Sequence, residues 1–269
     1  MDKISHLPNE VMVKILSCLT LTEAVRTSVL SSKWKYKSAM LPDLVFDEKR
    51  QTNALYVKIV DHVLLVHIGP IPMFKLSNRD VLLAPCDIDR WIIHLSRNSI
   101  KKVVLDIFRG HDYNIPSCLF SCQDIVHLEL FGCKLLNFPS TFKGFKSLKN
   151  LDFESVTVAQ DLFDKLIGCS PLLERLTLRD CDGFSNLLVN APNLQYIGAS
   201  DAFENVNIEN ALQLADFSID LRSNVEWVSA GSNSSNLLKV FDNVPHIQML
   251  TVGSKFISVI DFMVSPSIL

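Results

Sequence analysis

The sequence has no apolar run of the roughly 18 residues that a membrane-spanning helix needs. Its first residues, MDKISHLPNE, also lack the apolar segment of a secretory signal peptide. With 26 basic and 29 acidic residues, the chain has no excess of positive charge that would attract nucleic acid or anionic lipid. We therefore expect an intracellular protein of the nucleus, the cytoplasm or both, with neither nucleic acid nor a membrane as its partner.

Glycine is scarce, and its nine copies are never closer than 12 residues apart. This spacing excludes the glycine-rich loops that hold phosphates in common nucleotide-binding folds. The nucleophile elbow G-x-S-x-G, the pair C-x-x-C and the zinc motif H-E-x-x-H are absent as well. Each of the seven histidines stands without a carboxylate or cysteine at motif spacing. The sequence thus predicts no catalytic residue, no cofactor and no enzyme activity.

The seven cysteines are odd in number and irregular in spacing, which fits reduced thiols better than a disulfide framework. Cys118 and Cys122 are followed by Cys133, but no histidine pair stands at the spacing of zinc ligands. We therefore predict core thiols and no metal site. Since 48% of the 269 residues are hydrophobic, the chain has enough apolar material for one large or two smaller globular domains.

Residues 7–34 carry apolar side chains at the spacing of short amphipathic helices. Pro8 suits the first turn of the first helix, where its missing N–H is not needed. Thr22 is the expected N-cap of a second helix, with Glu23 at the end of the helix dipole that favours negative charge. The serines at 31–32 are expected to begin a third helix. Because a module of about 35 residues cannot bury a core of its own, its remaining apolar surface is expected to meet a partner.

Five stretches of this module follow one known pattern: Leu7-Pro8-x-Glu10-Val11, Ile15-Leu16-x-x-Leu19, Glu23-Ala24, Thr27-Ser28-x-Leu30-Ser31 and Lys33-Trp34-Lys35. They resemble the F-box of plant proteins. The resemblance implies binding to a Skp-type adaptor, which in turn holds a cullin scaffold and a ubiquitin-conjugating enzyme. It also implies eight adaptor contacts, with the tryptophan as the aromatic anchor: Leu7, Pro8, Val11, Ile15, Leu16, Leu19, Leu30 and Trp34. As alternatives, the segment is an ordinary helical cap, or Met12, Ile15 and Val29 pack only within the module.

One short pattern, apolar-x-x-apolar-x-apolar, recurs after the module. Four close copies begin at Ile125, Leu148, Leu173 and Leu194, and looser copies flank them on both sides. The middle apolar residues stand at 74, 103, 128, 151, 176, 197, 217 and 250, in steps of 20 to 33 residues. Most of these steps lie within the range of leucine-rich repeats, about 20 to 29 residues.

Each repeat is expected to form a strand, a turn and a short helix that stack on their neighbours. Helical patterns occupy residues 56–66 and 161–167, and Cys133 and Cys181 stand where such repeats carry Asn or Cys. The segment 170–181 resembles the repeats of plant F-box proteins. We therefore predict an α/β fold: a three-helix F-box followed by a leucine-rich-repeat solenoid, an arc with parallel strands on its concave face.

The predicted domains are an F-box at 1–45, a connecting segment with a first irregular repeat at 46–95, and leucine-rich repeats at 96–269. We expect the F-box to be rigidly continuous with the repeats, and an exposed loop over 229–236. The end of the chain is apolar over 256–264, where a solenoid needs a polar cap. Proteins of the resembled F-box/FBD/LRR type commonly continue into an FBD region. A short isoform, a truncated gene model or a partner that covers this end is therefore expected.

The predicted function is that of a substrate-recognition subunit of an SCF-type (Skp–cullin–F-box) ubiquitin ligase. The F-box would bind the adaptor, and outward strand residues would bind an unknown target protein: His127, Glu129, Asn150, Asp152, Arg175, Thr177, Arg179, Tyr196, Asp216 and Ser218. A generic solvated sheet face is the alternative for each of these residues. Two other functions stay open: a small-molecule-dependent F-box receptor, and a protein-interaction module outside any ligase.

Overall fold

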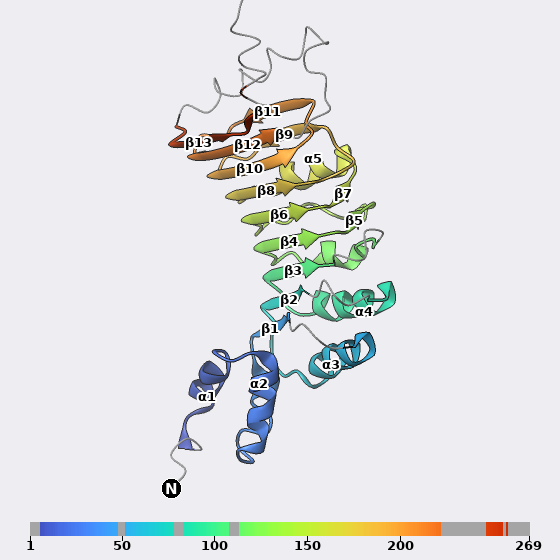
Figure 1. Cartoon of the computed structure of the whole chain (residues 1–269), viewed down its shortest axis with the longest axis vertical. Helices are drawn as coiled ribbons and strands as arrows, with labels where there is room; N and C mark the ends of the chain where they lie inside the picture. Colours follow the sequence, from blue (N-terminus) through green and yellow to red (C-terminus); the bar gives the residue numbers. More distant parts are fainter. Residues whose placement is uncertain are drawn as a thin grey trace, which may run out of the picture.

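The computed structural model describes residues 6–47, 52–77, 83–107, 113–221, 246–254 and 257. A small helical module at the N-terminus is followed by a long stack of parallel strands with helices along one side (Figure 1). The predicted α/β architecture with parallel strands is therefore confirmed.

The N-terminal module contains two short α-helices and two single-turn 3₁₀ helices: α1 (Asn9–Leu16), α2 (Leu21–Arg26), η2 (Thr27–Val29) and η3 (Ser38–Met40). The predicted third helix is wrong, because residues 32–37 form turns. There the Trp34 N–H donates to the Ser31 carbonyl three residues back, at 3.1 Å, which is the tighter 3₁₀ pattern rather than an α-helical bond. This tight backbone turns the Trp34 side chain into the core, where it is 3% exposed.

Helix α2 is capped at Thr20, not at the predicted Thr22. The Thr20 hydroxyl accepts a hydrogen bond from the Glu23 backbone N–H at 3.3 Å. In return the Glu23 carboxylate accepts one from the Thr20 backbone N–H at 3.0 Å. This reciprocal capping box needs a glutamate three residues after the cap, which Thr20 has. The bonds from the Thr20 backbone and hydroxyl lower the pKa of Glu23.

Replacing Thr20 with alanine should lower the free energy of unfolding by about 1 kcal/mol, because the first turn of α2 loses its cap. Thr22→Ala is the matched control, and it should change that free energy by no more than about 0.5 kcal/mol. Urea denaturation followed by circular dichroism measures both effects. Equal losses for the two variants would contradict the capping role of Thr20.

The large sheet of the described chain has nine parallel strands that pair in chain order. They are β1 (Asp43–Phe46), β2 (Met73–Ser77), β3 (Lys102–Asp106), β4 (His127–Phe131), β6 (Asn150–Glu154), β8 (Arg175–Arg179), β10 (Tyr196–Asp201), β12 (Asp216–Leu221) and β13 (Met249–Val252). Phe74 lies opposite Val103, which lies opposite Leu128, and this alignment continues to Leu250. The eight predicted repeat strands and their register are therefore confirmed.

Strand β1 is a ninth strand that was not among the predicted repeats, although Leu41, Leu44 and Phe46 follow the same pattern. Leu44 lies opposite Phe74, so the end of the module becomes the first strand of the sheet. The Tyr56 hydroxyl, from the following helix, donates to the Phe46 carbonyl at 2.9 Å. The Phe46 and Phe74 rings also meet at 5.6 Å between centroids. The module is thus continuous with the repeats through shared sheet and core, as predicted.

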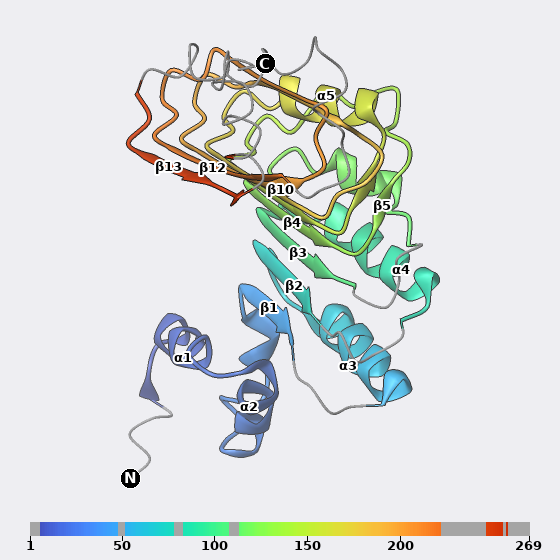
Figure 2. The same ribbon diagram turned by 45° about the horizontal axis from the view of Figure 1, so that its top comes forward.

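One side of the large sheet is covered by helices and short strands (Figure 2). The helices are α3 (Asn53–Val66), α4 (Pro85–Ser96), the 3₁₀ helix η4 (Ser117–Ser121) and α5 (Gln160–Gly168). Two small parallel pairs accompany them: β5 (Lys134–Leu135) with β7 (Thr157–Val158), and β9 (Asn186–Asn190) with β11 (Asn205–Glu209). Helices α3 and α5 confirm the two helical patterns predicted over 56–66 and 161–167. Among the described helices, none is long and apolar enough to cross a membrane.

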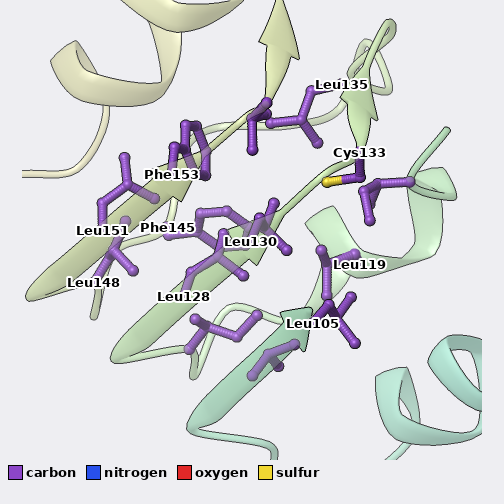
Figure 3. Packing of buried hydrophobic residues seen from close by; sticks show 14 of the residues in the cluster. Leu105, Leu119, Leu128, Leu130, Cys133, Leu135, Phe145, Leu148, Leu151 and Phe153 are labelled. Atoms are coloured by element: carbon purple, nitrogen blue, oxygen red, sulfur yellow. The ribbon is translucent and has the colours of Figure 1, made fainter. Parts of the chain in front are cut away.

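The core fills the space between the large sheet and this covering layer. Figure 3 shows how it repeats from strand to strand: Leu128 and Leu130 of β4 lie opposite Leu151 and Phe153 of β6. Cys133 and Cys181 are buried in it, as the repeat pattern predicts. Burial raises the pKa of Cys133, and it raises the pKa of Cys181 to about 12. Both groups are therefore neutral thiols that pack as small apolar side chains.

The core opens at the last described strand. Leu250 of β13 is 47% exposed, whereas the equivalent residue in each of the seven preceding repeats is at most 1% exposed. The predicted loop over 229–236 lies outside the described residues. Of the apolar C-terminal run, only Ile257 is described, and it is exposed.

Candidate functional site

The N-terminal module carries apolar side chains that the described part of the chain leaves uncovered. These residues, which we call the docking surface, are Val11, Ile15, Leu19, Val25, Val29, Leu30, Tyr36 and Met40. Helix α1 has two apolar stripes, each of two residues four positions apart. Met12 and Leu16 point into the core, whereas Val11 and Ile15, on the neighbouring stripe, are exposed. A helix with two adjacent apolar stripes buries one and exposes the other. Several exposed apolar side chains on one small module indicate an interaction site.

The eight predicted adaptor contacts divide into three groups. Five are exposed: Pro8, Val11, Ile15, Leu19 and Leu30. Leu7 is half-buried against the core. Leu16 and Trp34 are corrections, since they are 0% and 3% exposed and offer no side-chain surface to a partner. The alternative for Met12, Ile15 and Val29 was packing within the module alone. Met12 is buried and fits this alternative, whereas Ile15 and Val29 are exposed and do not.

A groove between α2 and α3 extends the docking surface. It consists of two hollows of about 410 and 360 Å³, lined in common by Leu21, Val25, His62 and Val63. Apart from His62 and Tyr36, the ionisable side chains in the lining are Arg26, Lys35 and Lys58, which are all basic. The sequence did not predict this groove, because helical periodicity shows the apolar side of each helix but not which helices lie together.

The side of the large sheet that no described element covers, which we call the open face, carries alternate strand residues. All ten predicted target-binding residues lie on it, and each is half-buried or exposed: His127, Glu129, Asn150, Asp152, Arg175, Thr177, Arg179, Tyr196, Asp216 and Ser218. The strand neighbours that point the other way, such as Leu128 and Leu176, are buried. The period of two in a strand therefore places the predicted residues together on one surface. Binding of a target by these residues stays a prediction.

Ion pairs cross the middle of the open face. Arg179 contacts both Asp152, at 3.2 Å from Nη2 to Oδ1, and Glu154, at 3.1 Å from Nε to Oε2. His127 Nε2 lies 3.5 Å from Glu129 Oε2, and this hydrogen bond is the main reason why the pKa of Glu129 is lowered. Burial raises the pKa of Asp152, against the opposing effect of the Arg179 charge. The charge of Arg179 is thus compensated within the face itself.

A hollow of about 130 Å³ opens in the same face between β2 and β8. The buried Val104 and Phe131 belong to its lining, and its charged residues are Lys75, Asp106, Glu129, Asp152, Glu154 and Arg179. Drug-sized ligands occupy pockets of about 300–1,000 Å³, so this hollow has room for a single side chain of a bound protein. In the described parts of the chain, no three His, Cys, Asp or Glu side chains are grouped as a metal site.

The structure joins two parts: a helical module with an exposed apolar surface, and a parallel sheet of repeats with a polar open face. This combination is that of an F-box followed by leucine-rich repeats. Family sequence models match the same two parts. The model described as "F-box domain" matches residues 4–45, and the one described as "FBD-associated F-box protein At5g56370, LRR repeats" matches residues 88–267. The chain belongs to the family of F-box proteins with leucine-rich repeats, which confirms the resemblance drawn from its sequence.

Similar proteins of Arabidopsis thaliana carry names of the same kind. The "F-box/FBD/LRR-repeat protein At1g13570" is 38% identical over 275 residues, which cover 97% of this chain and 64% of the relative. The "FBD-associated F-box protein At4g10400" is 30% identical over 96% of this chain and 65% of its own length. The "F-box protein At4g09920" is 34% identical over 72% of this chain and 64% of its own length. The chain thus spans less than two thirds of the length of these relatives.

Proposed function

We propose that this protein is the substrate-recognition subunit of an SCF-type ubiquitin ligase. F-box domains generally bind Skp-type adaptors, and the exposed docking surface on the F-box is the observation that carries the proposal. The adaptor would connect the chain to a cullin, and the open face would bind the target protein. F-box/LRR families are generally non-catalytic, so the chemistry of ubiquitin transfer would belong to the partners.

The direct connection between the F-box and the repeats supports separate sites for the adaptor and the target. Strand β1 ends the F-box and begins the large sheet, so an adaptor at one end and a target on the open face would be held at a fixed spacing. Holding two reactants together in this way raises their effective concentration, to about millimolar levels for short connections. The protein would therefore accelerate ubiquitin transfer by position alone.

Replacing Ile15 with aspartate should weaken binding to a purified Skp-type adaptor at least about 30-fold, as expected for a central interface residue. Ile15 is exposed, so the change places its charge in water while the adaptor is absent and the fold is retained. The matched control is Leu212→Asp, an exposed leucine in a turn that precedes β12. Isothermal titration calorimetry measures the affinity, and thermal unfolding checks the fold. Equal affinity of the Ile15 variant and the wild type would contradict the proposal.

The same pair of variants separates ligase partners from targets in cells. Co-purification with the wild type should give adaptor, cullin and targets, whereas the Ile15→Asp variant should retain only the targets. A point variant is preferable to deletion of the predicted F-box at 1–45, because Asp43 to Val45 belong to β1 and pair with β2. If the wild type brings down no adaptor or cullin, the protein is an interaction module outside any ligase. We propose a nuclear or cytoplasmic location, which imaging of a fluorescent fusion would test.

A further inference from the structure

A tyrosine forms an aromatic platform on the open face, around Gly198 in the middle of β10. A Cβ atom at Gly198 would lie 2.5 Å from the Tyr196 hydroxyl oxygen and 3.0 Å from its Cζ. The tyrosine therefore lies flat along its own strand, in the space that the missing side chain leaves. Gly198 pairs in a regular parallel ladder with Thr177 and Ser218, so its backbone geometry does not itself require glycine. The glycine makes room for the ring.

Arg175 of the neighbouring strand lies over this ring. Its guanidinium carbon is 4.0 Å from the centroid of the Tyr196 ring, which is the geometry of a cation–π contact. Arg175 is exposed, and Tyr196 is half-buried beneath it. The stacking restricts the arginine before any partner arrives, so that less conformational entropy is lost when the guanidinium binds.

The charge of Arg175 is not neutralised by the described part of the face. Its direct neighbours across the strands are Asn150 and Tyr196, which are uncharged, and the Asn150 amide is hydrogen-bonded to His127 Nδ1 at 3.2 Å. Arg175 makes no ion pair with a described residue, in contrast to Arg179 on the same strand, which contacts two carboxylates. A guanidinium that is oriented, exposed and not paired with any described carboxylate can bind a carboxylate of another protein.

We propose that Arg175, held on the Tyr196–Gly198 platform, is the anchor that binds an aspartate or glutamate side chain of the target protein. This inference rests on the proposed function of the open face as the target-binding surface. The carboxylates of Asp152 and Glu154 on the neighbouring strand β6, and of Glu129 on β4 beyond it, oppose a polyanion such as nucleic acid. None of the three pairs with Arg175, so one acidic side chain can bind there. The face thereby selects an acidic residue within a protein segment of mixed charge.

The test uses the full chain and a displayed library of random peptides, panned at an ionic strength of about 0.15 M. Asp or Glu should be enriched at one fixed position of the selected peptides. For a synthetic peptide of the winning sequence, Arg175→Gln should raise the Kd at least about 10-fold, and so should replacement of its acidic residue by the amide. Gly198→Ala, which displaces the tyrosine ring, should raise the Kd by a smaller factor, about 3-fold, since it leaves the charge in place.

The control variant removes an equivalent charge from the covered side of the sheet. Lys165 on α5 lies over the Phe142 ring, 6.0 Å from its centroid, and Lys165→Gln should leave the Kd unchanged. Failure to select peptides, selection without an acidic residue, or unchanged binding by the Arg175 variant would each overturn the proposal. Arg175-dependent binding of a single-stranded oligonucleotide would overturn it in favour of nucleic acid. The affinity of the same variants for the adaptor is measured in parallel. A protein that does not bind the adaptor contradicts the proposed function, whereas a variant that binds the adaptor but not the peptide has lost only the Arg175 anchor.

Discussion

Replacing Trp34 with alanine is expected to lower the free energy of unfolding by about 3–5 kcal/mol, the usual cost of removing a buried tryptophan. Trp34 belongs to the buried cluster that also contains Met12, Leu16 and Leu41, and these residues form most of the interior of the F-box module. Domains are typically stable by only 5–15 kcal/mol, so the loss is a large fraction of the total. Differential scanning calorimetry should show a lower Tm, and adaptor binding should weaken because the module unfolds.

The control for this prediction is Val29→Ala, since Val29 is 85% exposed on the docking surface. That variant should keep the wild-type Tm and lose adaptor affinity directly. The two variants therefore separate a residue that supports the surface from one that forms it. A Trp34→Ala variant with the wild-type Tm and no adaptor binding would reverse the assignment and make Trp34 a direct contact.

The corrections at Leu16 and Trp34 show what periodicity cannot decide in a very short helix. In α1 the spacing of four residues joins Met12 to Leu16 and, equally, Val11 to Ile15, so both stripes are apolar in the sequence. Only the packing of α1 against the rest of the module selects the first stripe as core. The strands of the repeats pose no such problem, because alternation assigns each side chain to one face.

The repeat register was predictable because stacking forces equivalent residues into equivalent positions. The steps between middle apolar residues identified eight strands correctly, from Phe74 to Leu250. Strand β1 was not predicted although Leu44 precedes Phe74 by a step of similar length, because Asp43–Phe46 lies across the predicted boundary between the F-box and the connecting segment. The sequence also placed residues such as Arg175 on the open face, but not their partners. Cross-strand contacts such as Arg179 to Asp152 join positions some 20 to 30 residues apart, which strand alternation alone does not pair. The contact of Arg175 with the Tyr196 ring is of the same kind.

Replacing Gly144 with alanine is the second change with a large expected effect, a loss of about 2–5 kcal/mol in the free energy of unfolding. Gly144 has a φ of +88°, which costs any other residue about 1–2 kcal/mol. Its missing Cβ leaves space for the carbonyl group of Cys169, the residue that ends α5. A methyl group there would collide with backbone, which cannot be relieved by a change of rotamer, and overpacking of this kind adds about 1–3 kcal/mol.

Gly69 provides the matched control for the collision, because its φ is +105° but no atom lies within 4 Å of the position of a Cβ. Gly69→Ala should therefore lose only the backbone contribution of about 1–2 kcal/mol. Guanidinium denaturation measures the free energy of unfolding of both variants. The difference between their losses is the contribution of the contact between the loop around Gly144 and the end of α5. Equal losses would show that the end of α5 moves aside at little cost. A larger loss for Gly144 means that neighbouring repeats fit against each other through backbone as well as side chains, so the arc that presents the open face is stiff along its length.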